Sequence, residues 1–400
     1  MMDSLKFVSL SYQGLSMIPF LLFCLCLSAC CFYCYAIYAA STFFRRSHLI
    51  AQDKDIHPLL SILKPICGRD REAYKNLASF CQQDYPEYQI IFAVRNRQDP
   101  GLEVVQQIIH DFPNLEIQLV VSENTIGTNL KVSNLANAAA FAKHEILVIA
   151  DSDIRVGRDY LRRIVQPLQD TNVGVVTCPY RSLAKGYATT IEALGSATEF
   201  HAGVFVGRHL EGIKFALGST IVIRKQVLQV IGGFPAIANY LEDDFQLGYL
   251  PTKFGYKVVL SDYVVEHVLT TSTLSDSIQR QIRWARGTRV SRPLGYIGLI
   301  FTHGTATSLL FLIATGGSWL GWAGLGLTWS TRLFMAWIIG VHHLQDPATK
   351  KFFWLVPLRD LIGFALWCYG SVGRSIKWRG QKLQLTKNGQ LLLLKTNLPY

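Results

Sequence analysis

Hydrophobic residues first gather in one long block near the start of the chain. Positions 7–44 contain no Lys, Arg, Asp or Glu, and positions 17–40 within them are apolar almost throughout. A membrane span needs about 20 such residues, and the apolar core of a signal peptide is shorter. Arg45 and Arg46 follow at once, and basic residues favour the cytoplasmic side of a span. The pattern predicts an N-terminal transmembrane anchor over residues 1–44, followed by a cytoplasmic domain.

Short apolar runs then alternate with helix-like segments between positions 45 and 290. The apolar runs predict strands at 59–66, 88–94, 117–121, 146–149, 173–178 and 215–223. The intervening segments predict helices at 71–82, 102–110, 130–142, 158–169 and 275–289. This order predicts an α/β domain with a mostly parallel sheet and helices on both faces. The sequence has no G-x-G-x-x-G and no P-loop, which disfavours the common dinucleotide and nucleoside triphosphate classes.

Uncharged apolar sequence returns in the last third of the chain. Positions 293–331 are long enough for two short spans, with a turn at Gly316–Gly317 between them. Positions 352–372 are a candidate last span, but Arg359–Asp360 interrupts it. Charges inside a membrane are costly, so we expect these two to pair or to line a pocket for a lipid acceptor. The weakly apolar positions 188–207 are a candidate interfacial or re-entrant helix.

The final segment, 373–400, reads as a basic tail. Four full spans would place this tail on the outer side, against the preference of basic residues for the cytoplasm. Either one C-terminal segment is re-entrant or interfacial, or the rule fails here, and both alternatives stay open. The net charge of +11 suits a face that lies against anionic lipid. Nucleic acid is disfavoured as a partner because the basic residues are dispersed and no recognition motif accompanies them.

Two carboxylates provide the first candidate chemistry. Asp151 and Asp153 come directly after the predicted strand at 146–149. Open α/β sheets bind ligands at the carboxyl ends of their strands, and carboxylate oxygens suit a hard divalent cation such as Mg²⁺ or Mn²⁺. A D-x-D at this position is typical of nucleotide-sugar transferases, and a solvated turn is the alternative interpretation.

Further candidate groups follow along the chain. Lys64–Pro65 ends the first predicted strand, where a lysine either contacts a diphosphate or uracil or is simply solvated. The three acids Glu242-Asp243-Asp244 begin a predicted helix. There they would either interact favourably with the positive end of the helix dipole or supply a general base. Arg280 and Arg283 share one helix face beside Trp284, an arrangement that suits a diphosphate or anionic lipid headgroups.

The order of these groups, ending just before an apolar segment, resembles the family 2 and family 21 type glycosyltransferases with their D, D-x-D, D, (Q/R)-x-x-R-W pattern. The nearest resemblance is to the ceramide glucosyltransferase family, including its bacterial bacteriohopanetetrol glycosyltransferase branch. Supporting stretches are Lys131-Val-Ser-Asn-Leu135, Asp151-Ser-Asp-Ile-Arg-Val156, Gly232–Gly233, Val264-Val-Glu-His267 and Ser375-Ile-Lys-Trp-Arg379. The resemblance implies a GT-A fold, a UDP-sugar donor, a divalent cation, a membrane lipid acceptor and an inverting reaction.

The resemblance also implies roles for particular residues. Asp243 corresponds to the catalytic base, and Asp151 and Asp153 to the residues that hold the metal. Arg280, Arg283 and Trp284 correspond to the catalytic (Q/R)-x-x-R-W box.

Other positions would bind the donor or differ from the family pattern. Lys64–Pro65 and Lys131 match donor-binding positions, and His201 falls near the family's functional histidine. The first aspartate of the pattern is the main departure. Asn96 takes its place and can still accept a hydrogen bond from uracil, and Asp99 is the other candidate.

The expected activity is transfer of a hexose from UDP-glucose to the hydroxyl of ceramide. The alternative is transfer of N-acetylglucosamine from its UDP donor to bacteriohopanetetrol in hopanoid biosynthesis. A processive polysaccharide synthase is less consistent with the sequence because such enzymes carry more C-terminal spans. A non-catalytic scaffold is favoured only by Asn96.

Overall fold

The computed structural model describes residues 2–49, 56–270, 273–378 and 381–393. Its main sheet is built from β1 (Leu60–Ile66), β2 (Tyr88–Val94), β3 (Glu116–Val121), β4 (Ile146–Ile149), β6 (Val173–Thr177), β8 (Ile221–Arg224) and β9 (Lys257–Leu260). The strand order is β3-β2-β1-β4-β8-β6-β9. Only β8 runs antiparallel to its neighbours, so the predicted mostly parallel sheet is confirmed.

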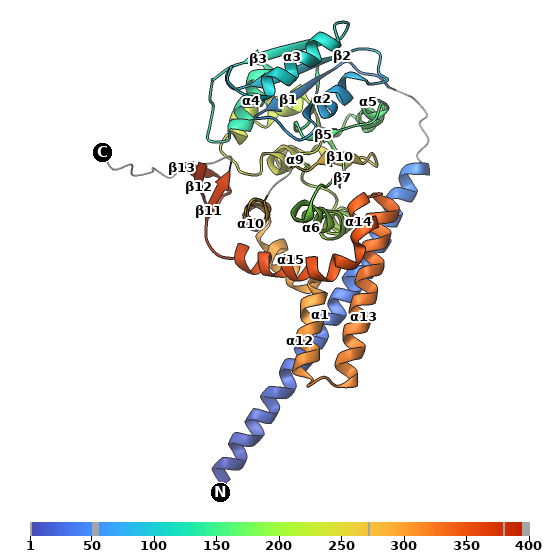
Figure 1. Cartoon of the computed structure of the whole chain (residues 1–400), viewed down its shortest axis with the longest axis vertical. Helices are drawn as coiled ribbons and strands as arrows, with labels where there is room; N and C mark the ends of the chain where they lie inside the picture. The colour runs from blue at the N-terminus through green and yellow to red at the C-terminus, as the bar shows by residue number, and fades with distance from the viewer. Residues whose placement is uncertain (1, 50–55, 271–272, 379–380, 394–400) are drawn as a thin grey trace, which may run out of the picture.

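Helices cover both faces of this sheet (Figure 1). They are α2 (Ala73–Cys81), α3 (Gly101–Asp111), α4 (Leu130–Ala139), α5 (Tyr160–Ile164), α8 (Lys225–Val230) and α9 (Asp243–Lys253). Neighbouring strand residues pack on opposite faces, as the period-2 geometry of a strand requires. Ile62 lies in the cluster that includes residues of α2 and α3, and Leu63 lies in the cluster that includes residues of α4 and α9. The core is therefore two apolar layers, one on each side of the sheet.

The predicted strand at 215–223 is shorter in the structure, because β8 begins only at Ile221. The preceding residues form a loop in which Gly218 N donates to the Asp244 carboxylate. The apolar run marked the position of the strand correctly. The loop departs from extended pairing because its backbone donor binds a side chain of another element.

Long apolar helices project from the α/β domain. They are α1 (Met2–Leu49), α12 (Gly304–Ala314) and α13 (Trp319–Ala336), which extend together away from the sheet (Figure 1). In the part of the chain that the structure describes, Met17–Arg45 and Pro347–Gly370 are long and apolar enough to cross a membrane. A third candidate is the pair Pro293–Thr302 and Gly304–Ala314, bent by 51°. The predicted Gly316–Gly317 turn joins α12 to α13, with both residues at positive φ.

The last apolar helix, α15 (Val356–Gly370), runs across the direction of α1 and α13 beneath the α/β domain (Figure 1). It packs against α6 (Tyr187–Gly195) and α10 (Leu274–Ser291). Its charged residues are paired, as predicted. Arg359 lies 3.2 Å from Glu199, and Asp360 lies 2.7 Å from Arg332. Positions 188–207 are helical, as predicted, and form the run of α6, a π-helical segment (Ser196–Phe200) and α7 (His201–Glu211).

The described part of the basic tail contains a small sheet that the sequence analysis did not predict. Strands β11 (Ser375–Trp378), β12 (Gln381–Leu385) and β13 (Leu391–Leu393) pair antiparallel. Their buried residues, Ile376, Leu383, Leu385 and Leu391, pack against Leu241 next to the three acids. The alternating apolar positions and the Asn388–Gly389 turn were the overlooked strand signals.

Candidate active site

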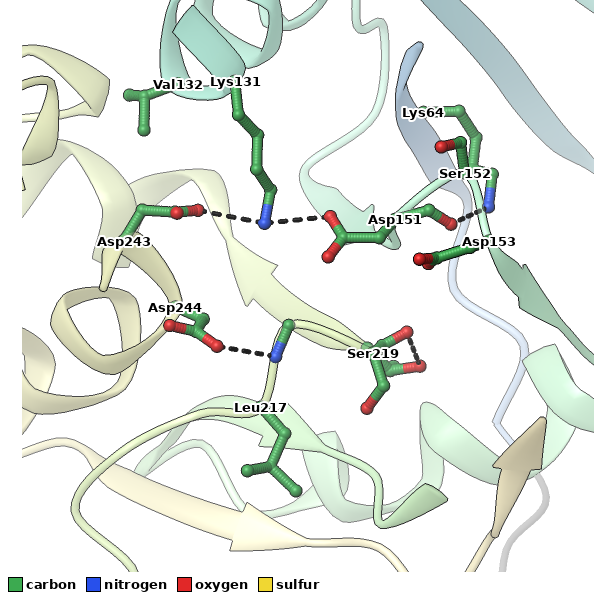
Figure 2. A network of polar contacts seen from close by, with 12 residues as sticks. Lys64, Lys131, Val132, Asp151, Ser152, Asp153, Leu217, Ser219, Asp243 and Asp244 are labelled. Carbon is green, nitrogen blue, oxygen red and sulfur yellow. Dashed lines mark hydrogen bonds and ion pairs between the residues drawn. The ribbon is translucent and has the colours of Figure 1, made fainter. Parts of the chain in front are cut away.

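One lysine joins the D-x-D to the three-acid segment. Lys131 lies in the first turn of α4, whose N-cap residue Asn129 accepts hydrogen bonds from the first backbone N–H groups of the helix. Lys131 Nζ is 2.9 Å from Asp151 Oδ1 and 3.2 Å from Asp243 Oδ2 (Figure 2). Burial alone would lower the pKa of Lys131, but the charges of Asp151 and Asp243 outweigh it and raise the pKa. The lysine is therefore a fixed cation between two carboxylates.

The three consecutive acids have different surroundings. Asp243 is 5% exposed, and its Oδ1 accepts a hydrogen bond of 3.2 Å from Asn129 Nδ2. Asp244 accepts from Gly218 N at 3.0 Å and from Phe245 N at 2.8 Å, so it holds two backbone groups. Burial, followed by the charge of Asp243, raises the pKa of Asp244 to about 6. Of these two carboxylates, Asp243 is the one that makes an ion pair with Lys131, the lysine that also contacts Asp151.

Glu242 lies against helix α10. A Cβ atom at Gly287 would come within 2.0 Å of Glu242 Oε1, so only glycine at this helical position leaves room for the carboxyl group. Burial, followed by the charge of Asp244, raises the pKa of Glu242 to about 8. The contact joins the three-acid segment to the helix that carries the Arg-x-x-Arg-Trp box.

A second lysine lies beneath the D-x-D. Lys64 Nζ donates to the backbone oxygen of Asp151 at 2.7 Å and lies 3.8 Å from the centre of the Phe80 ring. The side chain is fully buried in β1, next to the buried Pro65, and burial lowers the pKa of Lys64 to about 7. Lys64 thus fixes the backbone at the end of β4. Its predicted contact with a donor stays a prediction.

Asp153 contacts a histidine on a neighbouring strand. His267, on β10 (Val265–Val268), lies with Nε2 3.2 Å from Asp153 Oδ2. Burial alone would raise the pKa of Asp153, but His267 outweighs it and lowers the pKa. Among the residues that the structure describes, no three His, Cys, Asp or Glu side chains converge as a complete cation site.

The donor set nevertheless fits a divalent cation that is shared with a substrate. The side chains of Asp151 and Asp153 are 36% and 29% exposed, so their oxygens are accessible. Mg²⁺ sites commonly use one or two protein carboxylates and complete the shell with substrate phosphates and water.

The arginine box is oriented by a buried carboxylate. Arg280 Nε and Nη2 donate to Glu192 Oε1 and Oε2 at 2.7 and 2.6 Å, a bidentate pair. Glu192 is 3% exposed on α6 and also accepts from Ser277 Oγ at 2.7 Å. Arg283, one turn further along α10, lies 5.3 Å from the centre of the Trp378 ring in the C-terminal sheet. Trp284 is partly buried on the same helix.

Both ring nitrogens of His201 contact the backbone. Nδ1 donates to the Ser196 oxygen at 2.8 Å, and Nε2 accepts from Tyr180 N at 3.1 Å. Burial lowers the pKa of this fully buried histidine to about 4, so it is neutral. The Tyr180 ring packs edge-on to both His201 and His267, at 4.6 and 5.4 Å between ring centres. A catalytic role for His201 stays a prediction. Its contact with Tyr180 N holds the first residue of β7 (Tyr180–Leu183).

The two candidates for the missing first aspartate differ in their contacts. Asp99 accepts from Gly68 N at 2.9 Å and from Gly101 N at 2.8 Å, so it ties the loop after β1 to the start of α3. Asn96 follows β2, is partly exposed and accepts from Gln98 N at 3.1 Å. The carboxylate of Asp99 is thus occupied by loop contacts, which favours Asn96 as the donor-facing candidate.

Comparison with known proteins places this site in a family. The model of Glycosyl transferase family 21 matches residues 21–391. The chain belongs to glycosyl transferase family 21. The predicted enzyme class, a hexosyltransferase, is confirmed by this membership.

Curated relatives and solved structures agree with that assignment. Ceramide glucosyltransferase 1 of Caenorhabditis elegans is 24% identical over 390 residues, which cover 93% of this chain and 82% of the relative. Ceramide glucosyltransferase 3 of the same organism is 26% identical, over 64% of this chain and 56% of its own length. The mannosyltransferase PcManGT of Pyrobaculum calidifontis, solved with GDP-Man and Mn²⁺, aligns with a TM-score of 0.50 at 17% identity, over 87% of this chain and 96% of that one. The predicted GT-A fold is confirmed.

Several residues of this family 21 site were not predicted from the sequence. Asn129 precedes a predicted helix, which is the usual position of a capping residue, so a signal for it existed. Gly287 is an isolated glycine inside a helical pattern, which often marks a close packing contact. Glu192 and Gly218 carry no local signal, because their partners lie 88 and 26 residues away in the sequence.

Proposed function

We propose that this enzyme transfers glucose from UDP-glucose to the primary hydroxyl of ceramide in a membrane. The observation that carries the proposal is the Asp151–Lys131–Asp243 arrangement, in which one ammonium joins the D-x-D to a buried carboxylate. A donor site and a candidate general base are thereby held next to each other, as single displacement requires. The family membership and the two ceramide glucosyltransferases of Caenorhabditis elegans support the choice of donor and acceptor.

The donor half of the reaction uses charges on the catalytic domain. Asp151 and Asp153 would hold a divalent cation, which offsets charge on the leaving nucleoside diphosphate when it is bound. Arg280 and Arg283 would stabilise the same phosphates, most strongly in the transition state. Glu192 fixes the guanidinium plane of Arg280, which reduces the reorganisation needed when the donor binds.

The acceptor half depends on Asp243. Its Oδ2 is buried and faces the Lys131 ammonium at 3.2 Å. A carboxylate in this state can take the proton of a lipid hydroxyl as that oxygen attacks the anomeric carbon. Asp244 and Glu242 are less suited to the role, because the first binds backbone N–H groups and the second packs against Gly287.

A second candidate function is transfer of N-acetylglucosamine from its UDP donor to bacteriohopanetetrol. The contact between His267 and Asp153 favours it, because His267 belongs to the Val264–His267 stretch that resembles the bacterial branch. The catalytic roles would be unchanged, and only the pockets for sugar and lipid would differ. A processive polysaccharide synthase is disfavoured by the two to three candidate spans among the described residues.

The membrane placement that we propose has the catalytic domain, residues 45–290, on the cytoplasmic side. Residues 1–44 are the anchor, and 291–372 are the C-terminal membrane helices. In this arrangement α12 enters the membrane, α13 returns from it, and α15 lies at the surface. Residues 373–400 then stay on the cytoplasmic side, which removes the conflict with the positive-inside rule. The crosswise direction of α15 supports this arrangement (Figure 1).

A transfer assay on purified protein tests the proposal. UDP-glucose and UDP-N-acetylglucosamine would each be offered with ceramide and with bacteriohopanetetrol in nanodiscs, and the products weighed by mass spectrometry. A hexosylceramide is the expected product. An N-acetylhexosaminyl hopanoid would select the second candidate. No product in any pairing, from protein that still binds UDP, would reject both.

A further inference from the structure

Four charges meet where the catalytic domain contacts the membrane helices. Arg332 of α13 lies 2.7 Å from Asp360 of α15 and also donates to Thr198 Oγ1 at 3.0 Å. Arg359 of α15 lies 3.2 Å from Glu199, which belongs to the same π-helical segment as Thr198. We call these four charged residues the membrane-side cluster. Their formal charges sum to zero.

The membrane-side cluster has hydrogen-bonding capacity that its own members do not use. Arg332 is 3% exposed and Arg359 is 8% exposed. In the described part of the chain, Arg359 Nε and Nη1 and Arg332 Nη1 have no hydrogen-bond partner. The same holds for Nε2 of His303, a buried residue whose electrostatic neighbours are all four members of the cluster. Buried guanidinium donors without acceptors are rare in folded proteins, so a ligand that supplies acceptors is the direct explanation.

Arg359 is also held closely by small residues. A Cβ atom at Gly195 would lie 2.2 Å from Arg359 Nε, and a Cβ atom at Gly363 would lie 2.6 Å from its Nη1. Glycine at both positions therefore makes room for a guanidinium between α6 and α15. A Cβ atom at Gly363 would also meet Glu199 Oε2 at 3.0 Å. Ordinary apolar packing between α6 and α15 would not require glycine at these two positions.

The position of the cluster relates it to the reaction centre and to the lipid. Glu192 and Glu199 lie seven residues apart on one helical run, which is about 10 Å or two turns. Glu192 holds Arg280 of the catalytic box, and Glu199 holds Arg359. The Glu199 side chain is 34% exposed and the next residue, Phe200, is 43% exposed, so the cluster reaches the surface at this point. A headgroup that enters from the membrane here lies about two helical turns from Glu192 and the proposed phosphate-binding Arg280.

We propose that the membrane-side cluster binds the neutral polar headgroup of the lipid acceptor through its hydroxyl and amide groups. The inference rests on the proposed function, whose acceptor site it specifies. The unused arginine nitrogens donate to carbonyl and hydroxyl oxygens, and the Glu199 carboxylate accepts from O–H and N–H groups. A neutral headgroup with both kinds of group matches both sets. A lipid phosphate would fill the donors but would be repelled by Glu199 and Asp360.

Photolabelling tests the site independently of turnover. The full-length protein would be placed in phosphatidylcholine nanodiscs with a ceramide that carries a photoactivatable group beside its amide. Labelled peptides would be mapped by mass spectrometry, with phosphatidylglycerol as competitor. The variants are Glu199→Gln, at a partly exposed position, and Arg359→Gln. The matched control is Glu211→Gln, which removes a surface ion pair with Arg292 at the end of the same helical run.

The expected label falls on the segment 196–200 and on α15, and phosphatidylglycerol does not displace it. Glu199→Gln should lower ceramide affinity and raise the ceramide KM by about tenfold, the usual effect of one charge-assisted hydrogen bond. The KM for UDP-glucose and the slow hydrolysis of UDP-glucose without acceptor should not change. Glu211→Gln should match the wild type in all of these measurements.

Other outcomes overturn the inference. Label elsewhere, unchanged ceramide affinity in Glu199→Gln, or displacement by phosphatidylglycerol would reject a neutral headgroup site. If Arg359→Gln fails to fold, Glu199→Gln still decides. An equal fall in melting temperature, hydrolysis and labelling in Glu199→Gln would identify the cluster as a brace between helices. Ceramide bound at the cluster without transfer to it would reject the proposed function and leave the binding site standing.

Discussion

Asp243→Asn separates catalysis from folding at this site. Asparagine keeps the shape of the side chain, and its amide oxygen can still accept from Asn129, which contacts Asp243 Oδ1 at 3.2 Å in the wild type. The substitution removes only the negative charge beside Lys131 and the ability to accept a proton. Loss of a general base typically lowers a rate by about 10² to 10⁴. We therefore expect transferase turnover to fall by at least a hundredfold.

The same substitution should change the free energy of unfolding little. The charge that it removes is attracted by Lys131 and repelled by Asp151. At 3.2 Å, the attraction between Asp243 and Lys131 is about 5 kcal/mol for an effective dielectric constant near 20. Asp151 contacts the same ammonium at 2.9 Å, so the two carboxylate oxygens are no more than about 6 Å apart. Their repulsion is then about 3 kcal/mol or more, and Asp244 adds to it. The attraction to Lys131 therefore exceeds the repulsion from the other carboxylates by about 2 kcal/mol or less.

Three measurements on one preparation test this reasoning. Turnover would be followed by product mass, Mn²⁺-dependent UDP affinity by calorimetry, and stability by thermal melting in nanodiscs. Asp170→Asn is the control, because it removes the charge from a surface ion pair with Lys257. We expect UDP affinity within about threefold of the wild type in both variants. Near-normal turnover in Asp243→Asn would refute its role as base. A large loss of melting temperature would refute the balance of charges.

Three further substitutions test the D-x-D and the three-acid segment. Asp151→Ala should weaken Mn²⁺-dependent UDP binding at least tenfold, and unchanged affinity in calorimetry would contradict its role in holding the cation. Gly287→Ala should lower turnover more than tenfold, because the new methyl group displaces Glu242 beside the base, whereas Gly203→Ala has open space and should be neutral. Burial raises the pKa of Glu242 from 4.5 to about 8, so the folded protein binds this proton more tightly than the unfolded chain does. That stabilisation is complete below pH 4.5 and is lost as pH rises through 8. The melting temperature should therefore fall more steeply between pH 5 and 8 in the wild type than in Glu242→Gln, and parallel curves would count against the shift.

Much of the fold followed from the sequence because its signals are local. The strand that carries Lys64 and the strand that ends just before Asp151 are short apolar runs, and the helix that begins at Asp243 has acids in its first turn. Hydrophobic periodicity and the residues typical of helix ends depend only on neighbouring positions in the sequence. The small sheet in the tail was not predicted, although Leu383 and Leu385 alternate with polar residues.

The contacts within the site were less accessible, because they join distant parts of the chain. The sequence places Glu242, Asp243 and Asp244 together but does not show which partner each side chain contacts. Their roles depend on Asn129 and Gly287, which reach them only after folding. The membrane arrangement was limited in the same way, since composition identifies an apolar helix but not its direction. Only tertiary packing against α6 and α10 shows that α15 lies crosswise beneath the catalytic domain.

The anomeric configuration of the product tests the central claim most directly. If Asp243 activates a lipid hydroxyl for one direct attack on the sugar, the configuration at the anomeric carbon must invert. Nuclear magnetic resonance of the purified glycolipid made from an α-linked UDP-sugar should therefore show a β-linked sugar, recognised by the large three-bond coupling between its H1 and H2 protons. An α-linked product would require a second displacement, and would contradict single displacement at Asp243.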